Sequence, residues 1–294
     1  DVYYKVGVGG FVADNYIVKG SEPIFPALEF MSNALCRVAL GPQGPETQLV
    51  LLQKRGAEHL QVGVMASKAV TGVSLDRVWM ICDELAGRIE PASYSDAVLN
   101  ALLTCPNDAK PDNYLLEVVD VAQPPAGQQR SLQHIRRLRL TPLDNDRSCV
   151  APALGRVGGR GPTAGSHTLL GMRCFLFMMQ ELLQAPLAPE SAARLLRRTP
   201  LEAAALWLQR LHRYDEWLRG AGLTEESERY WALPVRATTG TAARVFRRLA
   251  QLQQLVREEA TVTHERLWEE CEPVAAAVYR HVRRGAEARA GGPL

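Results

Sequence analysis

Long hydrophobic runs are missing from this chain of 294 residues. A helix that spans a bilayer needs about 18 consecutive apolar residues, whereas the longest candidate stretch, Leu169 to Leu183, is interrupted by Arg173, Gln180 and Glu181. We therefore expect no transmembrane segment. A signal-peptide pattern is also missing at Asp1, where a strand-like segment starts directly, and we expect a domain that belongs to a longer chain or assembly.

Paired cysteines and an excess of one charge sign are missing too. None of the six cysteines forms a C-x-x-C pair, and the six histidines do not complete a zinc-site spacing. We expect reduced thiols, most of them packed as small apolar residues, in an intracellular, cytoplasmic protein, or in the host cytosol for a secreted effector. The net charge of +2 argues against nucleic acid as a partner. The cysteines are Cys36, Cys82, Cys105, Cys149, Cys174 and Cys271.

The composition that is present, with 47% hydrophobic and 22% charged residues, is that of an ordinary globular protein. The length suits one large domain or two lobes. Apolar patterning predicts a strand-rich region at 1–65, a hinge and a loop-bearing part at 66–166, and a helical region at 167–294. The strands expected after the first helix are 47–53 and 60–65, and the hinge is 66–72. A helix is expected at 75–85, and another begins at the cap Ser95-Asp96. A further strand is expected at 114–119. The helices expected in the last region are 168–184, 189–197, 200–220, 224–232, 240–258 and 262–283.

The stretch from Asp108 to Asn113 spells D-x-K-P-x-N. Kinase-type phosphotransferases use this spacing: a carboxylate accepts the proton of the attacking hydroxyl, a lysine contacts the transferred phosphate, and an asparagine holds a metal ion. Asp108, Lys110 and Asn113 are the candidates for these roles. An ordinary Pro-Asp-Asn turn is the alternative interpretation.

Glycines follow the first expected strand, at Gly7, Gly9 and Gly10. Glycine lets backbone N–H groups approach a phosphate closely and accepts positive φ angles. The pattern is therefore typical of a loop that covers a nucleotide. A plain hairpin turn explains the same residues.

Lys19 ends the next apolar strand, and Glu29 lies in the first turn of a helix expected over residues 26–40. A strand lysine held by a helix glutamate places an ammonium group against the α and β phosphates of ATP. Glu29 also suits a helix N-terminus without any partner, and Lys19 suits a solvated sheet edge. In a different strand register, Lys5 and Glu22 take the places of Lys19 and Glu29.

A basic strand expected over 134–140 leads to a second acidic candidate, Asp144, with Asp146 as its alternative. Kinase-type folds present a metal-binding carboxylate after a strand that ends in Leu-Asp. Mg²⁺ takes oxygen ligands and keeps several waters, so one aspartate, one asparagine and the phosphates suffice. A polar β-turn is the competing interpretation of these residues.

Taken in this order, the residues resemble the atypical, protein-kinase-like superfamily. The sequence is most similar to the branch that contains the actin-fragmin kinase, the phosphoinositide kinases and bacterial kinase-like effectors. Val18 to Phe30 and Leu40-Gly41-Pro42 carry that likeness, which covers roughly residues 3 to 150. The resemblance implies an α+β, bilobal protein-kinase-like fold with a small β-rich N-lobe and a large helical C-lobe.

The same resemblance implies ATP and Mg²⁺ as cofactors and a hydroxyl group as phosphate acceptor, on a protein first and on a lipid or small molecule otherwise. The implied roles are phosphate contact for Lys19 with Glu29 as its partner, nucleotide cover for Gly7, Gly9 and Gly10, catalytic base for Asp108, γ-phosphate contact for Lys110, and Mg²⁺ ligation for Asn113 and Asp144.

Two alternatives compete with this activity. The short span between Gly7 and Lys19 and the long helical region also suit a pseudokinase, an interaction module within a larger assembly. An α+β domain with accidental motif matches is the third interpretation.

Overall fold

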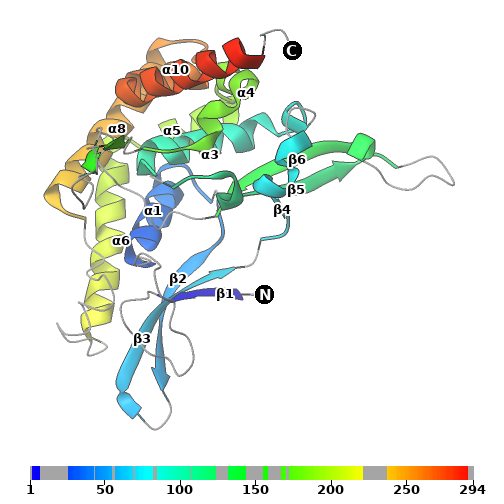
Figure 1. Cartoon of the computed structure of the whole chain (residues 1–294). Helices are drawn as coiled ribbons and strands as arrows, with labels where there is room; N and C mark the ends of the chain where they lie inside the picture. Colours follow the sequence, from blue (N-terminus) through cyan, green and yellow to red (C-terminus); the bar gives the residue numbers. More distant parts are fainter. Residues whose placement is uncertain are drawn as a thin grey trace, which may run out of the picture.

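The structure is a computed structural model of the chain. It describes residues 2–6, 26–42, 44–54, 57–68, 70–81, 85–106, 108–123, 132–143, 155–157, 167–169, 172–220 and 237–290. Helices and antiparallel sheets are mixed, which confirms the expected α+β class. In Figure 1, two three-stranded sheets lie along the lower and right-hand sides, and most helices gather above and to the left.

The first sheet consists of β1 (Val2–Val6), β2 (Thr47–Lys54) and β3 (Ala57–Lys68), in the order β1-β3-β2. All of its pairings are antiparallel. The strand expected at 60–65 is confirmed but is longer at both ends. It runs through residues 66–68, which we had assigned to the hinge, because these residues pair with β1.

The second sheet consists of β4 (Val73–Ser74), β5 (Tyr114–Val121) and β6 (Ile135–Pro142), in that order. The β5–β6 pair confirms both expected strands. Its register sets Tyr114 opposite Pro142. The hairpin therefore returns the chain to the end of the D-x-K-P-x-N loop.

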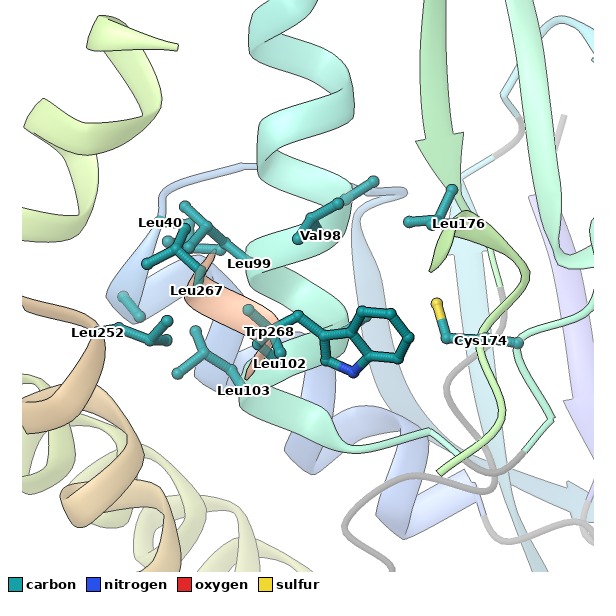
Figure 2. Packing of buried hydrophobic residues seen from close by; sticks show 14 of the residues in the cluster. Leu40, Val98, Leu99, Leu102, Leu103, Cys174, Leu176, Leu252, Leu267 and Trp268 are labelled. Atoms are coloured by element: carbon teal, nitrogen blue, oxygen red, sulfur yellow. The ribbon is translucent and has the colours of Figure 1, made fainter. Parts of the chain in front are cut away.

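The hydrophobic core lies around α3 (Pro91–Thr104), where Val98, Leu99 and Leu102 are fully buried. Figure 2 shows leucines of α3 meeting side chains of α8 and α9, including Trp268. Burying these apolar side chains is the main stabilising contribution to this region. The surrounding helices are α1 (Pro26–Ala39), α4 (Gln180–Gln184), α5 (Pro189–Leu196), α6 (Pro200–Gly220), α8 (Thr239–Glu258), α9 (His264–Cys271) and α10 (Pro273–Ala290).

Within the described ranges, no helix is both long enough and apolar enough to cross a membrane. The described cysteines are free thiols buried in the protein, as expected. They are Cys36, Cys105, Cys174 and Cys271.

The helix expected at 168–184 is wrong. The segment forms β8 (His167–Leu169), which pairs with β7 (Gly155–Val157), then the 3₁₀ helix Phe175–Met178 and the short α4. The reason lies in tertiary pairing, because the backbone groups of residues 173 and 175 bond to residues 106 and 109 instead of to helical neighbours. Such long-range pairing overrides a local apolar pattern.

Three further helix boundaries differ from expectation. The helix expected at 262–283 is divided, because Pro273 lacks the N–H that a continuous helix needs. The helix expected at 75–85 is a 3₁₀ helix, Leu75–Ile81. The cap expected at Ser95-Asp96 is wrong, since α3 begins at Pro91 and both residues lie in its buried interior.

The helices expected at 189–197, 200–220 and 240–258 are confirmed as α5, α6 and α8. The helix expected at 224–232 lies outside the described residues.

Candidate functional site

The predicted site residues divide into two groups. Gly7, Gly9, Gly10, Lys19 and Asp144 lie outside the described residues. The described ones are Glu29, Asp108, Lys110 and Asn113, of which the last three share one loop between α3 and β5.

The loop begins where Cys105 ends α3 in a left-handed backbone conformation, with φ of 47°. This conformation costs an ordinary residue roughly 1–2 kcal/mol, and here it turns the chain out of the helix axis. The Cys105 N–H still bonds to the carbonyl of Ala101 at 2.8 Å. The thiol lies 3.7 Å from the Glu272 carboxylate, so the C-terminal helices contact the start of the loop.

Main-chain hydrogen bonds tie the loop to residues 172–175. The Ala109 N–H donates to the Arg173 carbonyl at 3.1 Å, and the Arg173 N–H donates to the Pro106 carbonyl at 2.9 Å. The Phe175 N–H donates to the Ala109 carbonyl at 2.8 Å. Asp108 therefore sits next to a residue whose backbone is bonded on both sides, and its own side chain takes no part in these bonds.

Asn113 closes the loop onto Asp108. Its amide nitrogen donates to the Asp108 carbonyl oxygen at 2.5 Å, and the Lys110 N–H bonds to that oxygen at 3.0 Å. The Leu143 N–H donates to the Asn113 carbonyl at 2.9 Å, so Leu143, the residue directly after β6, lies beside Asn113. Since the amide nitrogen faces Asp108, the amide oxygen of Asn113 is the atom that suits a hard cation.

Lys110 is exposed, and its ammonium group pairs with Asp112 at 3.0 Å. Their side chains are 53% and 44% exposed. Exposed pairs of this kind contribute about 0–1 kcal/mol. The lysine can therefore exchange its carboxylate partner for a phosphate at little cost.

Tyr279 of α10 binds the segment that is hydrogen-bonded to the loop, and the sequence patterns did not identify this residue. Its hydroxyl accepts the Cys174 N–H at 2.8 Å, next to the main-chain bonds of the loop. Burial raises the pKa of Tyr279 to about 12, which keeps the hydroxyl neutral. The sequence carries no local signal for this contact, because 105 residues separate its partners.

Arg248 and Glu272 form a buried ion pair, and Glu272 contacts Cys105 at the start of the loop. The two residues are 6% and 4% exposed. Cys271 is adjacent, and burial raises the pKa of its thiol to about 11. The thiol is therefore neutral at physiological pH, and the charge balance rests on the arginine and the glutamate.

Glu29 is 1% exposed on α1, away from solvent as the proposed lysine partner requires. Its proposed partner, Lys19, lies outside the described residues.

An open hollow of about 640 Å³ lies on α6 and on the turn that precedes it, and contains no predicted site residue. It is lined by Arg197, Arg198, Glu202, Ala205, Leu206 and Gln209. Among the residues that the structure describes, no group of three or more His, Cys, Asp or Glu side chains is placed to hold a metal ion. No protein-family model matches the chain, and a search of curated proteins finds no match.

Proposed function

We propose that the chain is an ATP- and Mg²⁺-dependent phosphotransferase with a bilobal, kinase-like fold. It moves the γ-phosphoryl group of ATP to a hydroxyl group. The first candidate for this acceptor is a hydroxyl group on a protein. The observation that carries this proposal is the closed loop, in which Asn113 bonds to the carbonyl of Asp108 and receives the N–H of Leu143. That arrangement supports the proposal because it joins Asp108 to Asn113, and Asn113 to the residue that precedes Asp144 in the sequence.

In the proposed reaction, the acceptor oxygen forms a bond to the γ-phosphorus while the bond to the bridging oxygen breaks. The electron pair of the broken bond leaves with ADP, and the Asp108 carboxylate takes the proton of the hydroxyl. Lys110 balances charge on the transferred group. Asn113 and Asp144 would hold Mg²⁺, which when bound neutralises phosphate charge.

The N-terminal residues complete the proposal. Lys19, oriented by the buried Glu29, contacts the α and β phosphates, and Gly7, Gly9 and Gly10 cover the nucleotide. Their contribution is positioning, because phosphoryl transfer depends mainly on orientation and charge stabilisation.

The test measures transfer of labelled γ-phosphate from ATP·Mg²⁺ to the chain itself and to a mixed peptide acceptor. Asp108→Asn should lower the rate at least a hundredfold, since a general base contributes about 10²–10⁴-fold. Asp120→Asn is the matched control, because this aspartate of β5 pairs only loosely with Arg137 of β6, at 3.9 Å. Equal rates for wild type and Asp108→Asn would refute the assignment, and ATP binding without any transfer would support the pseudokinase alternative.

A further inference from the structure

The helix that carries Glu29 is held from one side by α6. Figure 1 shows α1 beside the long α6 helix. Met31 and Leu35 of α1 are 3% and 0% exposed. The position of Glu29 therefore depends on what packs against this helix.

The first contact lies next to Glu29 in the sequence. The indole N–H of Trp207 on α6 donates to the Met31 carbonyl at 2.9 Å, and Trp207 is fully buried. The Tyr214 ring meets Phe30 edge-on, with ring centroids 4.2 Å apart. A carbonyl oxygen has two lone pairs, so Met31 can accept the indole in addition to a helical N–H.

The second contact lies in the last turn of α1. Arg198, in the turn before α6, donates to the Val38 carbonyl at 2.8 Å. Carbonyls in the last turn of a helix have no partner within the helix, so a side-chain donor there acts as a cap. Gln253 of α8 fixes this turn in place, because its amide donates to the carbonyls of Leu195 and Arg198 at 2.8 and 2.7 Å.

These contacts do more than bury apolar surface. Apolar packing is non-directional, whereas two donors that reach backbone carbonyls in the first half and in the last turn of α1 restrict its rotation and its shift along the axis. We propose that Arg198, Trp207 and Tyr214 form a clamp that positions α1 and, through it, Glu29. Trp207 and Arg198 are positioning residues, and their effect on nucleotide binding rests on the proposed function.

The experiment compares Trp207→Phe and Arg198→Ala with Arg197→Ala, a neighbouring exposed arginine. Arg198→Lys, which keeps a donor, serves as the conservative variant. Hydrogen exchange of the peptide that covers residues 26–39 should accelerate roughly fivefold in Trp207→Phe and Arg198→Ala, in line with the loss of one net hydrogen bond. Exchange should stay unchanged in Arg197→Ala and return toward the wild-type rate in Arg198→Lys.

A second measurement, affinity for ATP·Mg²⁺ and for adenosine, separates positioning from general loosening. The clamp variants should weaken ATP·Mg²⁺ but not adenosine, because Glu29 acts through a phosphate-binding lysine. Unchanged exchange in both variants would overturn the clamp. Equal losses for ATP and adenosine, or faster exchange with unaltered ATP affinity, would overturn the positioning of Glu29. A wild type that binds no ATP would refute the proposed function and this role together, while exchange would still decide whether the clamp exists.

Discussion

The D-x-K-P-x-N loop and α1 are held in place by different means. Backbone bonds to residues 172–175 hold the loop, and side chains of the clamp hold α1. A main-chain bond survives most substitutions, whereas a side-chain contact is lost with one residue. The comparison therefore predicts a loop that tolerates substitution around it and a helix that does not.

The largest expected effect concerns the buried ion pair of Arg248 and Glu272, next to Cys105 at the start of the loop. Glu272→Ala should lower the free energy of unfolding by about 3–5 kcal/mol, because it leaves the Arg248 charge buried without its partner. Chemical denaturation measures this change. The control, Glu270→Ala, removes an exposed pair with Arg266 at 3.1 Å and should cost less than about 0.5 kcal/mol. Equal losses in the free energy of unfolding for the two variants would contradict the importance of burial.

A somewhat smaller effect depends on pH and concerns His264, which joins α3 to α9. Its ring lies 2.8 Å from the Ser95 hydroxyl and 2.9 Å from the Leu182 carbonyl. Burial lowers the pKa of His264 from 6.5 to about 4. As the pH falls, the unfolded chain binds this proton first, so the stability from neutral His264 is complete above about pH 6.5 and is lost toward pH 4.

Denaturation at several pH values should show this loss as roughly 3 kcal/mol in wild type. His264→Gln should lack that part of the pH dependence. The control His212→Gln, an exposed histidine paired with Glu216, should keep it. If the free energy of unfolding depended on pH in the same way in wild type and His264→Gln, other groups would control the stability in acid.

The smallest expected effect sharpens the comparison directly. Tyr279→Phe removes the acceptor of the Cys174 N–H and should cost about 1 kcal/mol. The main-chain bonds of the loop remain in this variant. Its transfer rate should therefore fall by a smaller factor than the transfer rate of Trp207→Phe. Thermal unfolding and transfer rates measure both quantities, with Tyr214→Phe, which keeps the ring against Phe30, as control. A larger loss of activity than in Trp207→Phe would reverse the comparison.

Local patterns in the sequence predicted part of this structure. Helix start and stop signals predicted α5, α6 and α8, and the basic, alternating stretch at 134–140 predicted β6. The D-x-K-P-x-N spacing predicted functional roles for Asp108, Lys110 and Asn113, which stay predictions, and the structure adds the bond from the Asn113 amide to the Asp108 carbonyl. These features depend on neighbours within a few residues.

Features that depend on distant partners were not predictable. Residues 172–174 have the composition of a helix, but this segment bonds to Pro106, Ala109 and Tyr279 instead of to helical neighbours. Tyr279 and Trp207 look like ordinary core aromatics until their partners, Cys174 and Met31, are known. Pro273 is the exception, because a proline inside an expected helix already indicates a break.

The most direct test of the proposed function is the thermal unfolding midpoint of wild type and Asp144→Ala with ATP, with and without Mg²⁺. A ligand that binds only the folded state raises the midpoint according to its concentration relative to Kd. The account predicts a rise in wild type that requires Mg²⁺ and that is lost in Asp144→Ala. No rise at millimolar ATP, or the same rise in both proteins, would contradict it.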